Sequence, residues 1–351
     1  MKYLFILTTI LCLFLAISGK AQIKNNKEIN IYVAKIQKQY NIPGLALAVI
    51  KNGEVIHKKN YGFANIELAV PVNDKTLFPL FSTSKVISVI TVYQLIEQKK
   101  LSLDNYISDF LDDLPNSWKK VQIKNLITHS SGLPDIVNYG SDNEVDAQQK
   151  VYKDTIKFAP NKQFDYNQTN YWLLNRIFQK VVGKTLSKYI LDTQFQSLLQ
   201  SVAYEGNNMK LVNNLSYGYV YSQNNAQFLK RNWSFPEYLY GAAALNMTLN
   251  AFVEWNKRFD NNEIISEKTK AQLFTPFNYE VKRDFTYGLD LLTNNGEISY
   301  GFSGGVSTAF RKFKNNNLTI ILLANGQFIP TDKLNGINEV VNNIANIAFK
   351  K

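Results

Sequence analysis

The sequence predicts an α+β protein in which both chain ends form one antiparallel sheet, flanked by helices, with a mainly helical domain inserted in the middle. Two observations carry this prediction. Apolar runs of strand length occur near the N-terminus and again near the C-terminus, whereas the long segment between them has helical spacing. Strands at both ends with helices between them imply that the ends meet in one sheet.

The N-terminal part of the sheet is predicted from a helix and a hairpin. Residues 29–40 carry apolar side chains at helical spacing, and a Pro-Gly pair then ends the helix. The apolar run over residues 45–50 has the length of a strand. Asn52-Gly53 favours a tight hairpin turn because both residues accept positive φ angles, so the returning strand is expected over residues 55–62.

The middle of the chain is predicted to be helical. A long helix is expected over residues 83–99, and its apolar residues cover more than one face, which indicates a helix buried inside the protein. Residues 100–250 are expected to form mainly helices and loops, for example a helix over residues 171–182 that Gly183 ends.

Strand patterns return from about residue 285. Four strands and a final helix are expected over residues 287–292, 296–302, 306–313, 318–323 and 334–349. An Asn-rich turn precedes the last strand.

The first residues are expected to be a signal peptide, residues 1–21. Residues 3–17 are apolar, and small residues follow where a signal peptidase reads, so cleavage is expected after Ala21. A membrane anchor is the alternative, but the apolar run is shorter than the ~20 residues that a spanning helix needs. Lipidation at Cys12 is disfavoured because Leu11 stands where a small residue is wanted. The protein is therefore predicted to be exported, periplasmic or secreted, with no stable membrane span after cleavage.

The mature chain, residues 22–351, is expected to be one domain. Its α/β part is expected over about 22–80 and 250–351, and its helical part over about 81–249. The sequence carries no signal for oligomeric state.

Composition and charge exclude several classes of function. The chain has 39 Lys and Arg against 28 Asp and Glu, a net charge of +11, which falls to 11 − 2 = +9 without Lys2 and Lys20. The lysines are scattered and no Rossmann or P-loop glycine pattern occurs, so no nucleic-acid partner and no cofactor is expected. His57 and His129 are the only histidines, and no cysteine follows residue 21, so no metal site and no disulfide are expected.

Ser82-Thr83-Ser84-Lys85 has the spacing of a serine nucleophile with a lysine base. Positions i and i+3 share a face of a helix, so the lysine amine can lie beside the serine hydroxyl. A serine needs a neighbour that takes its proton, and a buried lysine that stays neutral can do this. The same spacing occurs at Ser117 and Lys120, but that stretch is polar and loop-like, which indicates a solvated surface.

Several stretches resemble the superfamily of class C β-lactamases, D,D-peptidases and esterases, also called the serine β-lactamase and penicillin-binding-protein group. They occur in the family's order between about residues 40 and 325. These stretches are Pro43-Gly44-Leu45-Ala46, Asn52-Gly53, Thr76-Leu77-Phe78-Pro79-Leu80-Phe81-Ser82-Thr83-Ser84-Lys85, Leu101-Ser102-Leu103-Asp104 and Leu126-Ile127-Thr128-His129-Ser130-Ser131-Gly132-Leu133-Pro134. The resemblance implies catalytic roles for Ser82 and Lys85.

The family's Tyr-x-Asn motif is matched by Tyr166-Asn167-Gln168. The resemblance implies that the Tyr166 phenol shuttles protons between the nucleophile and the leaving group. Gln168 stands where the family has Asn, and its amide is expected to bond a substrate carbonyl from a different position. Gly241-Ala242-Ala243-Ala244 resembles a family stretch that borders the cleft. His129 is expected to be a structural residue whose ring bonds the loop backbone.

The family's Lys-Thr-Gly or His-x-Gly motif is matched by Phe302-Ser303-Gly304-Gly305, where an aromatic ring replaces the cation or imidazole. This removes a group that attracts a substrate carboxylate, while Ser303 is expected to remain a hydrogen-bond donor. The resemblance implies an oxyanion hole made by the N–H groups of Ser82 and Gly305. Phe302, Ser303 and Gly304 are expected to line the substrate site.

The sequence therefore predicts an exported serine hydrolase that cleaves an ester or amide bond through an acyl-enzyme on Ser82. Its expected partner is a small-molecule ester, a peptide or a peptidoglycan-derived substrate. One alternative is a penicillin-recognising β-lactamase or D,D-carboxypeptidase whose carboxylate partner is Arg311 or Lys312. Another is a catalytically weakened binding protein of the cell envelope, in which Gln168 and Phe302 degrade the site.

Overall fold

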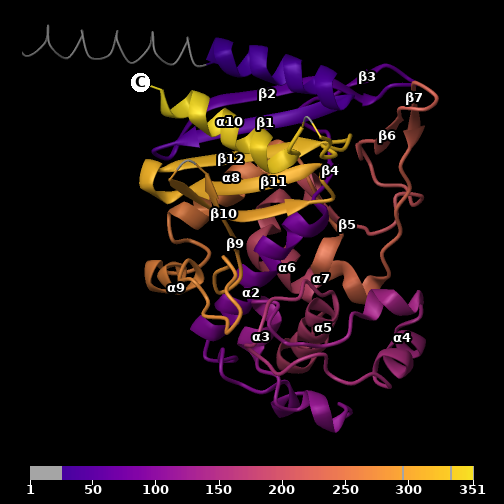
Figure 1. The fold of residues 1–351 in the computed structure, drawn as a ribbon, viewed down its shortest axis with the longest axis vertical. Coiled ribbons are helices and arrows are strands. Elements are labelled where there is room, and N and C mark those ends of the chain that lie inside the picture. Colours follow the sequence, from indigo (N-terminus) through magenta and orange to yellow (C-terminus); the bar gives the residue numbers. More distant parts are fainter. Residues whose placement is uncertain (1–25, 295, 333, 351) are drawn as a thin grey trace, which may run out of the picture.

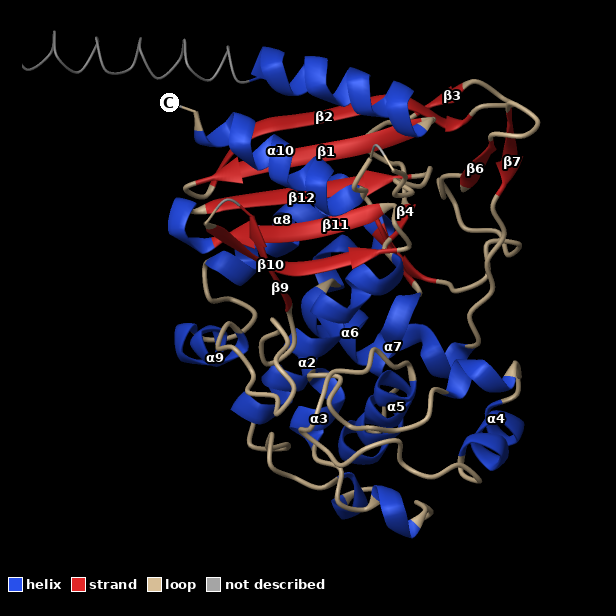
Figure 2. Cartoon of the chain, in the orientation of Figure 1, coloured by secondary structure: helices blue, strands red, loops and turns tan. Residues whose placement is uncertain are grey.

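A seven-stranded antiparallel sheet is the largest element of the computed structural model, which describes residues 26–294, 296–332 and 334–350 (Figures 1 and 2). From one edge to the other its strands are β3 (Val70–Pro71), β2 (Glu54–Asn65), β1 (Gly44–Lys51), β12 (Leu318–Ala324), β11 (Thr308–Phe313), β10 (Glu297–Gly304) and β9 (Asp290–Asn294). Three strands from the N-terminal part thus lie beside four from the C-terminal part, which confirms the predicted α+β class.

The two chain ends meet where β1 pairs with β12. Leu45 lies opposite Ala324 at one end of this pair, and Lys51 lies opposite Leu318 at the other. Every residue of β12 is buried. Because helices cover both faces of the sheet, its central strands carry apolar side chains on both sides and form continuous apolar runs in the sequence.

Each face of β1 contributes to a different part of the core. Leu45 and Leu47 pack in a cluster with the N-terminal helix, residues 26–40, and with α10 (Ile337–Phe349). Ala46 and Ala48 alternate with them and belong to the larger cluster, which includes α8 (Leu249–Asp260) and the helical part of the protein. The alternation along a single strand therefore separates the two layers of helices.

The helical part is built around α2 (Ser84–Glu97), which buries eleven of its residues, as expected for a helix with no polar face. The other helices are α3 (Ile123–Ile127), α4 (Glu144–Val151), α5 (Thr169–Val182), α6 (Leu186–Gln194), α7 (Tyr240–Ala243) and α9 (Glu267–Leu273). Figure 1 shows α2, α5, α6 and α7 gathered on the side of the sheet where β10 and the edge strand β9 lie.

Two small sheets in the middle of the chain were not expected from the sequence. β4 (Phe78–Pro79), β8 (Leu245–Met247) and β5 (Val202–Tyr204) form one, and β6 (Tyr219–Ser222) pairs with β7 (Gln227–Lys230) in the other. Strands of two to four residues are too short to show an alternating pattern, which explains why sequence reasoning missed them.

Candidate active site

Ser82 lies at the start of the buried helix, within the 3-10 turn Phe81–Thr83 that leads directly into α2. Two contacts fix this turn. The Leu80 N–H donates to the Leu245 carbonyl on β8 at 2.8 Å, and the Thr83 N–H donates back to the Leu80 carbonyl at 3.0 Å. The serine is therefore presented where the small sheet, α2 and the end of β10 meet.

The end of β10 approaches this turn so closely that only glycine fits. A Cβ atom on Gly304 would lie 2.2 Å from the Leu80 carbonyl oxygen and 2.8 Å from the backbone N of Ser82. Gly305 has φ +55°, and a Cβ there would lie 2.6 Å from the ring of Phe81. The glycines predicted from the sequence thus bring the backbone of β10 against the segment that carries Ser82.

Tyr166 contacts the serine directly. Its hydroxyl donates a hydrogen bond of 2.6 Å to Oγ of Ser82. The side chain keeps 38% of its surface exposed, but its hydroxyl end is enclosed, and this burial raises the pKa of Tyr166 to about 12. A phenol with this pKa stays protonated at neutral pH, which is the form that donates to Ser82.

Lys85 is completely buried, and its amine has other partners than the serine. Its Nζ donates to Oε1 of Gln168 and to the Ala242 carbonyl, each at 2.9 Å. It also lies 4.8 Å and 4.9 Å above the ring centres of Tyr166 and Tyr171. Among the described residues Lys85 makes no hydrogen bond to Ser82; Tyr166 is the side chain that touches both.

Burial sets the charge of this amine. Removal from water lowers the pKa of Lys85 to about 7, while the carboxylate of Asp135 opposes this shift. The amine is therefore close to the point at which it loses its proton at neutral pH.

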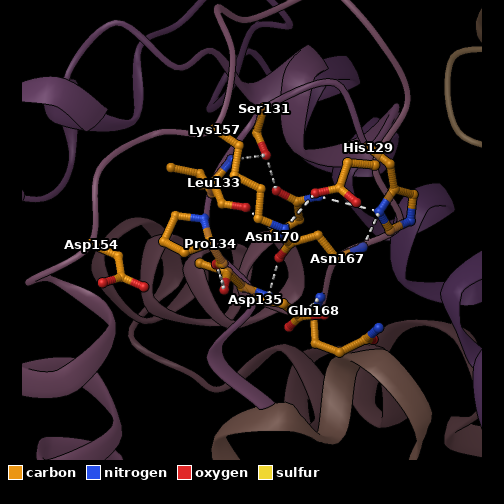
Figure 3. Close-up of polar contacts among 12 residues, drawn as sticks. His129, Ser131, Leu133, Pro134, Asp135, Asp154, Lys157, Asn167, Gln168 and Asn170 are labelled. Carbon is orange, nitrogen blue, oxygen red and sulfur yellow. Dashed lines mark hydrogen bonds and ion pairs between the residues drawn. The ribbon is translucent and has the colours of Figure 1, made fainter. Parts of the chain in front are cut away.

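Gln168 connects the lysine to a carboxylate that sequence reasoning missed. While the Gln168 amide oxygen accepts from Lys85, its backbone N–H donates to Oδ1 of Asp135 at 3.1 Å (Figure 3). Asp135 Oδ1 also accepts from Val137 at 3.4 Å, and burial raises the pKa of this carboxyl. The expected contact of Gln168 with a substrate carbonyl stays a prediction; since the amide oxygen accepts from Lys85, the amide N–H group would be the donor to such a carbonyl. Its place directly after Pro134, the last residue of the motif around His129, was the only sequence signal for Asp135.

His129 supports the loop that carries Tyr166. Its Nδ1 accepts from the N–H of Asn167 at 3.1 Å and lies 3.2 Å from Nδ2 of Asn170, as Figure 3 shows. Its ring lies 4.7 Å from that of Tyr166. Burial holds the pKa of His129 well below its usual range, so the ring is neutral. A neutral ring with these contacts fits a structural role.

The Phe302–Gly305 segment divides between two faces of β10. Phe302 is buried beside the site, with its ring 6.3 Å from that of Tyr166 and 6.1 Å from that of Phe285. Ser303 points to the other face, where its hydroxyl donates to Oδ1 of Asn338 on α10 at 2.8 Å. The expectation that Ser303 offers a donor to the substrate is therefore not met by this geometry, since neighbouring side chains of a strand point to opposite faces.

Neither alternative cation is available for a substrate carboxylate. Arg311 is 1% exposed and pairs with Asp290 at 2.7 Å, and Lys312 pairs with Asp260 at 2.7 Å. Both side chains are held by partners of their own. Ser117, in the second serine–lysine spacing, is exposed.

The site combines three groups beside an antiparallel sheet: a serine at the start of a buried helix, a lysine one turn further, and a tyrosine bonded to the serine hydroxyl. This combination is typical of the serine β-lactamase and penicillin-binding-protein superfamily. The family model described as Beta-lactamase matches residues 29–339. The chain therefore belongs to the Beta-lactamase family.

Relatives and solved structures agree with this assignment. The chain is 24% identical over 330 residues to "Putative penicillin-binding protein PbpX" of Bacillus subtilis (strain 168), covering 92% of this chain and 79% of that protein. It is 23% identical over 197 residues to "Protein flp" of Staphylococcus aureus (strain MRSA252), covering 53% of this chain but only 40% of that longer protein.

Two solved structures have the same fold. The hydrolase EstCE1, described as having promiscuous acyltransferase activity, matches with a TM-score of 0.76 at 16% identity, over 95% of this chain and 100% of that one. The D-amino acid amidase from Ochrobactrum anthropi SV3 matches with a TM-score of 0.74 at 18% identity, over 92% and 99%. At these identities the likeness establishes the fold alone.

The predicted signal peptide, residues 1–21, lies outside the described residues. Within the described part of the chain, no helix has the length and apolar character needed to cross a bilayer.

Proposed function

We propose that this protein is an exported serine hydrolase that cleaves an ester or amide bond through an acyl-enzyme on Ser82. The single observation that carries the proposal is the 2.6 Å contact from Tyr166 to Ser82, made by a tyrosine whose ring lies against the buried Lys85. This arrangement supplies a nucleophile, a proton carrier and a base within one connected group.

In the first step, Oγ of Ser82 forms a bond to the substrate carbonyl carbon, and the carbonyl electron pair moves onto oxygen. The Tyr166 oxygen takes the serine proton and gives its own hydroxyl proton to the uncharged amine of Lys85, which lies over the tyrosine ring; for this, the hydroxyl proton turns away from Oγ, toward which it points in the structure. With a pKa of about 7, roughly half of the Lys85 amines are uncharged near neutral pH. The N–H groups of Ser82 and Gly305 are proposed to hold the developing negative charge.

In the second step, the bond to the leaving group breaks, and the leaving alcohol or amine takes the proton from the same route. The acyl group remains on Ser82. Water then adds to the acyl carbon and gives a proton to this route. The bond between the acyl carbon and Oγ breaks, Oγ takes the proton back from the route, and the acid leaves, which restores the serine.

The substrate class follows from the walls of the site. Phe302 places an aromatic ring where the family often has a cation, and this ring lies 6.3 Å from that of Tyr166, which favours an uncharged part of an ester, peptide or peptidoglycan-derived substrate. EstCE1, a hydrolase, and the D-amino acid amidase share this fold, which supports an ester or amide bond as the one cleaved. The apolar segment over residues 3–17 supports export to the periplasm or the medium.

Intact mass spectrometry after exposure to a fluorophosphonate, and separately to a penicillin, tests the proposal. The wild-type protein should gain one adduct, mapped to Ser82, while Ser82→Ala gains none. Ser117→Ala is the matched control, because it removes the exposed serine of the second serine–lysine spacing and should label fully. The same spectrum of protein recovered from the expression host should give the mass of residues 22–351.

Two other functions predict different spectra. Preferential labelling by the penicillin would favour the penicillin-recognising alternative, which the name of the PbpX relative supports. A folded protein that gains no adduct from either probe would instead favour a binding protein with a weakened site.

A further inference from the structure

A cavity with an unusual charge balance lies beside the turn that carries Ser82. Its volume is about 380 Å³, and residues 208–212, 215–218 and 230–232 line it. Three cations, Lys210, Lys230 and Arg231, are among these lining residues, and no Asp or Glu is. The walls are otherwise largely apolar.

Arg231 is the cation of this cavity that lacks a counter-charge. Its Nη1 donates to the Gly305 carbonyl and to Oγ of Ser307, each at 3.2 Å, and its guanidinium lies 4.5 Å above the ring centre of Phe81. Over the described ranges no carboxylate forms an ion pair with it, and no hydrogen bond of its Nε or Nη2 is present. One edge of the guanidinium fork is therefore left for a ligand.

Among the residues that the structure describes, comparison with the other arginines shows that the lack of a carboxylate partner is particular to Arg231. Each of them pairs with a carboxylate: Arg176 with Asp113, Arg258 with Glu263, and Arg283 and Arg311 with Asp290. Burial lowers the pKa of Arg231, because a guanidinium removed from water without an anion is unfavourable. An anion at this edge would restore the balance.

The lysines of the cavity are already neutralised, and its rim is apolar. Lys210 lies 3.4 Å from Glu205, and Lys230 lies 3.4 Å from Glu67. Met209 is 74% exposed and Leu211 is fully exposed, so two large apolar side chains stand open to water beside one unpaired cation. This combination suits a ligand with one negative end and one apolar end.

We propose that this cavity binds a small amphipathic carboxylate, with the carboxylate on the free edge of Arg231 and the apolar part against Met209 and Leu211. A carboxylate accepts two parallel N–H groups from a guanidinium fork, which gives both strength and orientation. The ligand is either a free carboxylate or the acid end of a longer substrate. Binding does not require acyl transfer, so the proposal stands apart from the activity of Ser82.

Calorimetric titration of the full chain with hexanoate tests the site, with 1-hexanol and hexylamine as probes that match the apolar part without the negative charge. We expect saturable binding of hexanoate only. Arg231→Gln should weaken it about tenfold or more, because the loss of a charged fork removes the charge-assisted pair. Arg258→Gln is the matched control, since Arg258 is engaged with Glu263 outside the cavity, and it should bind as the wild type does.

Arg231→Lys keeps the charge without the fork and should bind more weakly than the wild type but more tightly than Arg231→Gln. It also serves if the Gln variant does not fold, as judged by thermal unfolding. The proposal is overturned if hexanoate and hexanol bind equally, or if neither Arg231 variant changes the affinity.

Hexanoate binding to protein already labelled at Ser82 by a fluorophosphonate shows whether the carboxylate is a free ligand or the acid end of a substrate. Unchanged hexanoate affinity after labelling would indicate a separate ligand. Competition between the label and hexanoate would indicate that the cavity receives part of the substrate.

Discussion

The Tyr166 hydroxyl donates to Oγ of Ser82 at 2.6 Å, although 84 residues separate the two in the chain. The loop that carries Tyr166 is held on its inner side by His129, which accepts the N–H of Asn167 and packs its ring 4.7 Å from that of the tyrosine. The phenol is therefore fixed toward the serine before any substrate binds. The Lys85 amine contacts this pair over the face of the Tyr166 ring, 4.8 Å from its centre, and not at the serine hydroxyl.

This relationship predicts that Tyr166→Phe loses activity without unfolding. Removing the hydroxyl should lower kcat on an activated ester about 10²- to 10⁴-fold, the usual range for a general acid–base group, while the ring keeps its packing. Stopped-flow or steady-state hydrolysis measures this, and the thermal midpoint checks the fold. Tyr106→Phe, another exposed tyrosine, is the control. A variant that retains wild-type kcat would remove Tyr166 from the proposed proton route.

The buried lysine predicts a pH dependence. Because the pKa of Lys85 is lowered to about 7 and the uncharged amine accepts the proton, kcat/KM should rise with pH through a midpoint near 7. Tyr166, with a pKa of about 12, stays protonated and should cause no decline below pH 9. A profile from pH 5 to 9 with an uncharged ester measures this. A value of kcat/KM that still rises about tenfold per pH unit at pH 9, as the ordinary lysine pKa of 10.5 would require, would contradict it.

Asp135→Asn should move that midpoint to a lower pH. The negative charge of Asp135 raises the pKa of Lys85, so its removal lets burial lower this pKa further. Asn keeps an Oδ1 that accepts from Gln168, so the geometry around Gln168 and Lys85 is retained. Asp154→Asn is the control, because Asp154 bonds Tyr139 and lies apart from Asp135 in Figure 3. Identical midpoints in both variants would show that the Asp135 charge does not reach Lys85.

The close approach of β10 predicts that Gly304→Ala slows acylation of Ser82 by about 10²-fold or more. The added Cβ would lie 2.2 Å from the Leu80 carbonyl and would force apart the segments that bear the proposed oxyanion donors. Loss of one such donor usually costs about 10²- to 10³-fold in rate. Fluorophosphonate labelling rates measure this. Gly140→Ala, with φ +58° and open space around it, should lower stability slightly and leave labelling unchanged.

Phe302→His should improve recognition of a substrate carboxylate. It returns an imidazole to the position where the family often has one, and a charge-assisted hydrogen bond contributes about 1.5 kcal/mol or more, roughly tenfold. The rate of penicillin adduct formation should therefore increase about tenfold at pH 6. Phe302→Leu, which keeps the position apolar, is the control and should show no gain. Equal rates in both variants would mean that this position does not contact the carboxylate.

The sequence by itself determined the secondary structure that bears the site and the two motifs that supply it. The apolar runs that became β1 and β12 predicted a sheet shared by the chain ends, because a buried strand must be apolar along its length. The Ser82–Lys85 spacing predicted a serine and lysine at the start of a buried helix, because helical periodicity is local.

Tertiary structure alone decided which partner each of these groups has. The sequence gives no signal that Lys85 donates to Gln168 and Ala242, that Ser303 turns toward Asn338, or that Arg231 lacks a carboxylate. These pairings join elements far apart in the chain. A buried polar group takes whatever donors and acceptors the packed elements bring within reach, so its partners follow from the assembled fold rather than from local pattern.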